Sequence, residues 1–240
     1  MRRFLMVGAA ALLFLAAAAP GLAKGRGNPN PGVLPPQSHA FGQSYGEWGA
    51  DWWNWAFSSP IEVNPLTDTT GEFCDTNQPD GPVFFLAGFL DLTGTGGPVM
   101  RDCTVPSGKA LFFPIVNSVF AGEFPTEEET RAAANAAIDA VIELEAGIDG
   151  EPLRDLWRYR AESPNFVLEL PEGAILDQLL GLSGDQSPSV TDGYWLMLAP
   201  LPPGEHTIHF RGLVMNPDGS EFEVEVFYFL TVVPRGQLGK

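Results

Sequence analysis

The segment Phe222–Val233 reads FEVEVFYFLTVV, and its pattern of side chains sets the expected fold class. Its first five residues alternate between apolar and acidic side chains, as in a strand with one face in solvent. From Phe227 onward both faces are apolar, as expected where a strand passes from an exposed edge into the middle of two packed layers. Asn216–Gly219 (NPDG) is a turn signal just upstream. The segment therefore predicts packed β-sheets.

Most of the remaining chain has the same character. Short apolar runs bounded by Gly, Pro, Asp or Asn predict further strands at Val83–Leu90, Ala110–Val119, Phe166–Leu170 and Tyr194–Ala199. Pro200–Gly204 (PLPPG) predicts a hairpin connection to a strand at Glu205–Arg211. We therefore expect a mostly β protein, a β-sandwich of the jelly-roll-like or Ig-like type, with two α-helices.

Two segments predict these helices. Ser44 and Glu47 have the spacing of a capping box, so we expect a helix near 44–57 that ends before Pro60. The second helix, near 126–146, begins with three glutamates in its first turn, where carboxylates favour the helix dipole. Its apolar positions have the spacing of one core-facing side, namely Ala134, Ala137, Ile138, Val141 and Ile142.

The N-terminus predicts export. Arg2 and Arg3 precede an unbroken run of apolar or small residues, and Gly21–Ala23 offers the small residues of a cleavage site. This is the layout of a secretory signal peptide over residues 1–23. A membrane anchor is the alternative, but the run is shorter than the roughly 20 residues that a spanning helix needs. We expect a secreted or periplasmic protein with no membrane span after cleavage.

The mature chain is expected to fold as one unit. Residues 24–40 are rich in Gly, Pro and Asn and lack an apolar period, which predicts a flexible tether. Residues 41–234 are then a single β-sandwich domain, and residues 235–240 a disordered tail. The chain carries a formal net charge of −17, and loss of two arginines with the signal peptide makes it −19. Such a surface repels nucleic acid and anionic lipid, so we expect neither as a partner.

Two loops resemble parts of metal or phosphate motifs. Asp75–Gly81 (DTNQPDG) is similar to a calcium loop, but Pro79 displaces the third ligand by one position. Gly94–Gly97 lacks the lysine of a phosphate loop. We therefore expect no metal and no cofactor.

Cys74 and Cys103 are the two cysteines of the chain. In an oxidising compartment an isolated pair most often forms one structural disulfide. A metal site is the alternative, but no histidine lies near either cysteine in the sequence. We expect a Cys74–Cys103 disulfide.

The predicted helix at 44–57 holds four of the six tryptophans. Its aromatic face is either packed on the sheet as core or exposed as a platform for a sugar ring or another flat ligand. The candidate ligand-binding residues on this face are Trp52, Trp53 and Trp55. Glu47 and Asp51 lie one turn apart on the narrow polar strip of the same helix and are candidate catalytic carboxylates.

The predicted strand Glu205–Arg211 (EHTIHFR) offers the other candidate catalytic residues. His206 and His209 are three apart, so on a strand they point to opposite faces and cannot easily share a metal ion. His206 is expected to lie with the buried apolar residues. Glu205 and His209 share the polar face, where they are either a catalytic acid and imidazole or ordinary cross-strand partners.

Several stretches together resemble a family of exported bacterial proteins of unknown function, and the likeness covers most of the mature chain. These stretches are Trp48–Trp55, Asn64–Pro65, Asp68–Gly71, Gly81–Gly88, Cys103–Pro106, Gly108–Pro114, Asp192–Trp195 and the GEHTIHF strand Gly204–Phe210. The resemblance implies a bacterial exported protein with a disulfide. It brings no activity, ligand or catalytic residue to these positions.

Two classes of function stay open. The favoured one is a non-catalytic extracellular or envelope protein that binds a carbohydrate or a protein, because the aromatic surface is large and no catalytic signature is present. The alternative is a secreted hydrolase that uses carboxylates, with Glu47, Asp51, Glu205 and His209 as its candidate residues. A catalytic general acid would need burial to raise its pKa.

Overall fold

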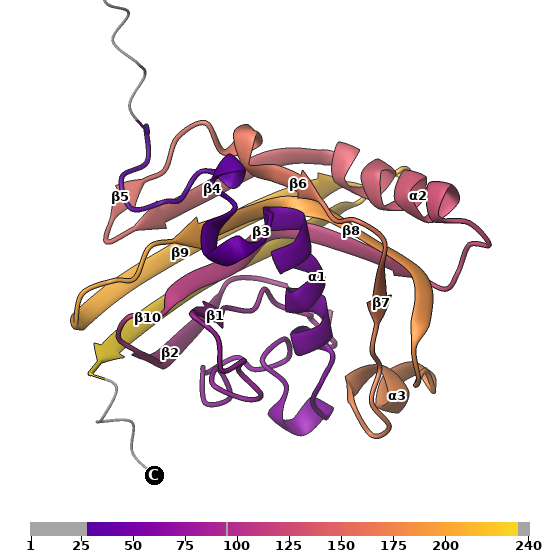
Figure 1. Cartoon of the computed structure of the whole chain (residues 1–240), viewed down its shortest axis with the longest axis horizontal. Helices are drawn as coiled ribbons and strands as arrows, with labels where there is room; N and C mark the ends of the chain where they lie inside the picture. Colours follow the sequence, from indigo (N-terminus) through magenta and orange to yellow (C-terminus); the bar gives the residue numbers. More distant parts are fainter. Residues whose placement is uncertain (1–27, 95, 235–240) are drawn as a thin grey trace, which may run out of the picture.

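The computed structural model describes residues 28–94 and 96–234. The predicted signal peptide, residues 24–27 of the predicted tether and the predicted tail at 235–240 lie outside this part. The described residues form ten strands in two five-stranded mixed sheets, together with three α-helices (Figure 1). The prediction of a mostly β protein is confirmed.

The first sheet, which we name sheet A, has the order β1-β3-β8-β6, and β7 also pairs with β8. Its strands are β1 (Val83–Phe85), β3 (Ala110–Ala121), β6 (Arg160–Glu162), β7 (Phe166–Leu168) and β8 (Gln186–Leu198). The second, sheet B, has the order β2-β10-β9-β4-β5. Its strands are β2 (Val99–Pro106), β4 (Val141–Ile148), β5 (Glu151–Pro152), β9 (Gly204–Met215) and β10 (Glu221–Val233). The pairs β1–β3 and β2–β10 are parallel, and the others are antiparallel.

The two sheets pack face to face. Phe113 of β3 stacks on Phe210 of β9 with ring centroids 5.2 Å apart. Gly212 of β9 lies against Val116 of β3, and a Cβ at this glycine would collide with the valine. The close approach of the two layers therefore requires glycine at this position.

The first predicted helix is confirmed as α1 (Tyr45–Ala56), and Ser44 and Glu47 form the expected capping box. The second, α2 (Glu127–Asp139), begins after Thr126 as expected, but its predicted end at residue 146 is wrong. Residues 141–148 are β4 instead, because their β-branched and apolar residues pair with β9 in the sheet. A third helix, α3 (Ile175–Leu180), was not predicted, and its six residues are too few for a clear period.

Two connections also differ from the predictions. Pro200–Gly204 is not a hairpin, because β8 belongs to sheet A and β9 to sheet B, so this segment passes from one sheet to the other. Residues 28–40 were predicted as part of a tether, but they lie against the folded part of the chain. Val33 is buried and bridges to Leu198, and the buried Asn30 donates to the carbonyl of Arg154.

The Cys74–Cys103 disulfide is confirmed, and it joins the segment before β1 to β2. Cys74 and Cys103 are both buried in the core. No helix among the described residues combines the length and apolar character that crossing a membrane needs.

Candidate functional site

The tryptophans of α1 belong to the core. Figure 1 shows α1 crossing in front of sheet A, and Trp52 and Trp55 are only 1% and 6% exposed. Each indole nitrogen donates to a protein oxygen: Trp52 to the Leu86 carbonyl (3.0 Å), Trp55 to the Thr76 carbonyl (2.9 Å) and Trp53 to Thr191 Oγ1 (2.8 Å). An exposed platform of three tryptophans is therefore absent from this part of the structure. Of the three, only Trp53 keeps a half-buried ring.

The two carboxylates of α1 have local partners. Glu47 accepts from the backbone nitrogen and the hydroxyl of Ser44, both at 2.7 Å, and these bonds lower the pKa of Glu47. Asp51 accepts from Gln43 Nε2 at 3.1 Å, and its partial burial raises its pKa. Glu47 thus caps the helix, and Asp51 links it to the segment before it.

The candidate residues of β9 are also separated by their partners. His209 Nε2 lies 3.0 Å from Glu225 Oε1, and its ring stacks on Phe227 at a centroid distance of 4.2 Å. Glu205 instead accepts from Thr231 Oγ1 at 3.1 Å. As predicted, the two side chains share one face of β9, but the structure does not pair them with each other.

His206 points to the opposite face of β9 and is mostly buried, as predicted. Its Nδ1 lies 2.8 Å from Asp149 Oδ2, and its Nε2 lies 3.0 Å from the carbonyl of Pro202. Burial alone would lower the pKa of His206, but these hydrogen bonds raise it above its ordinary value. Burial would raise the pKa of Asp149, and its bonds with His206 and the backbone lower it.

The outer face of sheet B, the face turned away from sheet A, exposes a row of apolar side chains. The register places Met100 of β2, Phe227 of β10 and His209 of β9 side by side. Phe229 lies in the next row, opposite Thr207. Met100 is 60% exposed and Phe229 is 42% exposed. This face is hollowed into a groove of about 620 Å³, which we name the sheet B groove, lined by Met100, Pro152, Thr207, His209, Phe227 and Phe229 among others.

Acidic side chains surround this apolar floor. Arg211, which follows His209 on β9, contacts three glutamates at once, namely Glu143, Glu145 and Glu223. Glu225 lies against His209, and Asp102 of β2 is exposed beside Phe229 in the register. Three carboxylates against one guanidinium leave a negative charge at this side of the groove.

Sequence reasoning expected both faces of this part of β10 to be buried, and that expectation is wrong. Val226, Tyr228 and Leu230 are buried against sheet A, but Phe227 and Phe229 point outward. The polar face of β9 could have indicated that these phenylalanines point outward, because residues paired across two strands point to the same side. Thr207 and His209 are the partners of the two phenylalanines.

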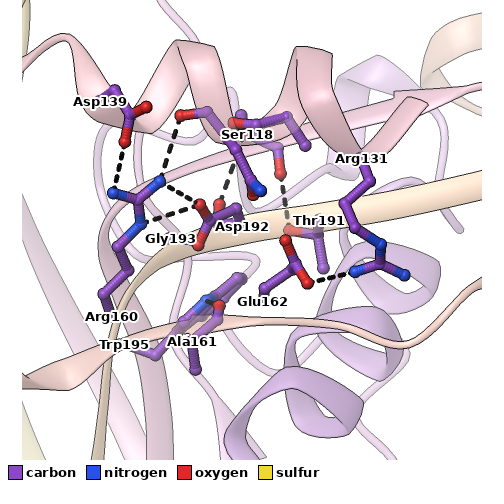
Figure 2. Close-up of polar contacts among 12 residues, drawn as sticks. Ser118, Arg131, Asp139, Arg160, Ala161, Glu162, Thr191, Asp192, Gly193 and Trp195 are labelled. Atoms are coloured by element: carbon purple, nitrogen blue, oxygen red, sulfur yellow. Dashed lines mark hydrogen bonds and ion pairs between the residues drawn. The ribbon is translucent and has the colours of Figure 1, made fainter. Parts of the chain in front are cut away.

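A buried ion pair that the sequence did not indicate ties sheet A to α2 (Figure 2). Asp192 of β8 is 1% exposed and accepts from Arg160 Nε at 2.9 Å and Nη2 at 2.7 Å. Arg160 also contacts Asp139 at the end of α2, at 2.6 Å. Burial raises the pKa of Asp192, whereas Arg160 opposes this shift. These contacts join β6, β8 and α2, so we assign the pair a structural role.

Comparison with models of known protein families gives no match, and comparison with curated protein sequences gives none either. Within residues 28–94 and 96–234, no three His, Cys, Asp or Glu side chains are grouped so that they could hold a metal ion. The sheet B groove is the site that the geometry favours, because it joins aromatic side chains, a histidine and an acidic rim on an outward sheet face with exposed side chains.

Proposed function

We propose that the protein is an exported, non-catalytic binding protein whose sheet B groove takes a protein partner with apolar and basic side chains. The observation that carries this proposal is the pair of exposed apolar side chains, Met100 and Phe229, on the floor of a groove. An outward sheet face in a monomer is usually polar, and contiguous exposed apolar surface marks interaction sites. Covering such surface contributes roughly 25 cal/mol per Å².

Charge selects the kind of partner. The chain has a net charge of −17, and the groove is bordered by Glu225 and by the glutamates around Arg211. Such a field attracts basic segments and speeds their encounter, and it repels acidic ones. A basic peptide with aromatic or aliphatic side chains would place its apolar groups on Phe229 and Met100 and its cations at the rim.

A protein partner fits the groove better than a carbohydrate. Sugar rings stack on the open face of an aromatic ring, but His209 covers one face of Phe227, with only 18° between the two planes. Of the three tryptophans considered as a sugar platform, Trp52 and Trp55 are buried in the core, and half-buried Trp53 donates to Thr191. The lining of the groove is also largely apolar, as protein interfaces are at their centres.

The contacts of the candidate catalytic residues favour structural roles over a hydrolase site. Glu47 accepts from Ser44 and Asp51 from Gln43. Glu205 accepts from Thr231, whereas His209 lies against Glu225. We also propose that residues 1–23 are a cleaved signal peptide. The two packed sheets would form a β-sandwich of the jelly-roll-like or Ig-like type.

The proposal is tested with peptides of defined charge. Twelve-residue peptides that alternate Lys with Phe or Leu are titrated into the mature protein, with the same peptides carrying Glu for Lys as a comparison. We expect saturable binding of the basic series only, weakened by salt and weakened by roughly tenfold or more in Phe229→Ser. Trp157→Ser removes an exposed aromatic ring elsewhere and should leave binding unchanged.

Three outcomes would count against the proposal. Equal binding of the acidic and basic peptides would remove the charge argument. Saturable binding of an oligosaccharide panel that is lost in Phe229→Ser would make the ligand a carbohydrate. Turnover on a hydrolase substrate panel that is lost in His209→Gln would favour the enzyme alternative.

A further inference from the structure

A second cavity, distinct from the sheet B groove, lies where the chain leaves β1. The parallel pairing of β1 with β3 ends early, and the last backbone bond runs from the Leu86 nitrogen to the Phe112 carbonyl at 3.0 Å. From there, side chains of sheet B hold the segment. Tyr228 OH bonds both the nitrogen and the carbonyl of Ala87, each at 3.0 Å.

Arg101 completes this attachment. Its side chain is buried, and Nη1 donates to the carbonyls of Ala87 and Gly88, each at 3.0 Å, while Nε donates to the carbonyl of Asp68 at 2.7 Å. Residues 87–88 are therefore fixed toward sheet B rather than along β3. This attachment holds the segment apart from β3 and leaves a gap between the two.

A β-bulge in β3 widens this gap. The register with β8 shifts between Pro114 and Val116, so β3 bulges opposite residues 88–90. The result is a cavity of about 230 Å³, which is lined by Trp52 and Trp53 of α1 and by Phe57 directly after it. The other side chains that line it are almost all apolar and include Leu66, Phe89, Leu90, Leu176, Phe222 and Val224. Among residues 28–94 and 96–234, none that lines this cavity is charged.

One polar side chain lines the cavity without being satisfied. Asn117 of β3 is among the lining residues, and its Nδ2 is buried without a hydrogen-bond partner in the described part of the chain. A buried donor without a partner costs roughly 1–3 kcal/mol, so native structures seldom keep one without a reason. A turn of this amide toward the cavity would let a ligand oxygen there accept from Nδ2.

We propose that this cavity binds a neutral, single-ring aromatic molecule whose carbonyl or hydroxyl oxygen accepts a hydrogen bond from Asn117 Nδ2. An apolar cavity of roughly 150 Å³ is enough for benzene, so about 230 Å³ accommodates a substituted ring. The rings of Trp53, Phe57 and Phe89 offer edge and face contacts to an aromatic ligand. The uncharged lining disfavours ions, because a buried charge would have no partner.

The test uses two probes of one shape, acetophenone and α-methylstyrene, in which a carbonyl oxygen is replaced by a methylene group. Each is titrated into the mature protein and followed by tryptophan fluorescence and by calorimetry. We expect one acetophenone per protein, bound roughly tenfold more tightly than α-methylstyrene because only the ketone accepts from Asn117. Asn117→Leu should remove this preference.

A filling variant tests the location. A Cβ at Gly88 would lie 3.8 Å from Val224 Cγ1, an ordinary contact, so Gly88→Leu can place its side chain in the cavity. Gly81→Leu is the matched control, because a Cβ there meets nothing within 4 Å. We expect Gly88→Leu to abolish binding of both probes and Gly81→Leu to leave it unchanged.

The inference is overturned if neither probe binds saturably to the folded protein, or if Gly88→Leu, still folded by circular dichroism, binds acetophenone as the parent does. Loss of probe binding in Phe229→Ser would place the ligand in the sheet B groove and would also overturn it. A preference for acetophenone that survives in Asn117→Leu would remove the assigned role of the amide. The peptide experiment on the sheet B groove is unaffected by any of these outcomes.

Discussion

Helix α1 and the outer face of sheet B are both rich in aromatic residues, yet they have opposite surroundings. On α1, Trp52 packs against Trp195 at 5.7 Å, and its indole nitrogen is bonded to a backbone carbonyl. On sheet B, Phe229 is 42% exposed and lies opposite a threonine. The density of aromatic residues in a segment therefore does not identify a binding surface.

The number of covering layers explains the difference. Sheet A has α1 on one face, and sheet B together with α2 on the other (Figure 1). Sheet B has sheet A on one face, and its other face carries exposed side chains such as Met100 and Thr207. An aromatic residue on sheet A is covered in either orientation, whereas on sheet B only every second residue along a strand is covered.

The comparison predicts its largest effect at Trp52. Trp52→Ala should lower the free energy of unfolding by about 3–5 kcal/mol, because it leaves a cavity in the core and a carbonyl without its donor. Phe229→Ala is the matched variant on the exposed side and should cost less than about 1 kcal/mol. Urea denaturation of both variants measures the contrast. Similar losses in the two variants would mean that the two aromatic regions do not differ as described.

The disulfide should have the next largest effect. Replacing Cys74 and Cys103 by alanine should cost about 3–4 kcal/mol, because a 29-residue separation is no longer closed in the unfolded chain. The bridge joins a segment that contacts α1, through the bond from Trp55 to Thr76, to β2 of sheet B. Denaturation of the parent protein with and without a reductant should give the same loss. A loss below about 1 kcal/mol would show that the core holds this segment without the bridge.

Loss of the Arg160–Asp192 ion pair beneath α2 should have the third largest effect on stability. Arg160→Met leaves Asp192 buried without its cation, and we expect a loss of about 2–3 kcal/mol. The value lies below that for a fully buried pair, because the Arg160 side chain is 31% exposed. Arg158→Met, which removes an exposed neighbouring guanidinium, is the control and should change stability little. Equal thermal unfolding of the two variants would contradict the structural role of the pair.

Local signals in the sequence were sufficient for some elements. The capping box of α1, the Asn216–Gly219 turn before β10 and the cysteine pair each depend on neighbouring residues or on a simple count, and each agrees with the structure. The end of α2 does not depend on such signals. Val141 continues the apolar period of the helix, and only the pairing of β4 with β9 makes it a strand.

The candidate sites depend on distant pairings. Met100, His209 and Phe227 form one row only because β2 and β9 both pair with β10 in a particular register. The contact of Arg160 with Asp192 likewise joins residues 32 apart in the sequence. The Pro-rich segment 200–204 could serve equally as a hairpin or as a crossing between sheets, and no local rule separates the two.

The smallest predicted effect concerns pH and the contact between β9 and the turn that joins β4 to β5. His206 has a raised pKa and Asp149 a lowered one, because the two are hydrogen bonded. A raised histidine pKa contributes stability that is complete below the unfolded value of about 6.5 and is lost as the pH rises through the folded value. A lowered aspartate pKa contributes stability that is present above about 3.9 and is lost as the pH falls through the folded value. The pair should therefore stabilise the folded protein most between about pH 3.9 and about pH 6.5.

Its contribution should be less than about 1 kcal/mol, because the Asp149 side chain is 47% exposed and solvent screens the pair. Thermal unfolding from pH 5 to pH 8.5 should show a small decline in the parent protein that is absent in His206→Gln. Glutamine keeps a hydrogen-bonding side chain at this position but carries no titrating charge. The same variant should leave peptide binding in the sheet B groove unchanged, because His206 points to the opposite face of β9 from His209. A decline of equal size in His206→Gln would show that groups other than His206 cause the pH dependence of stability.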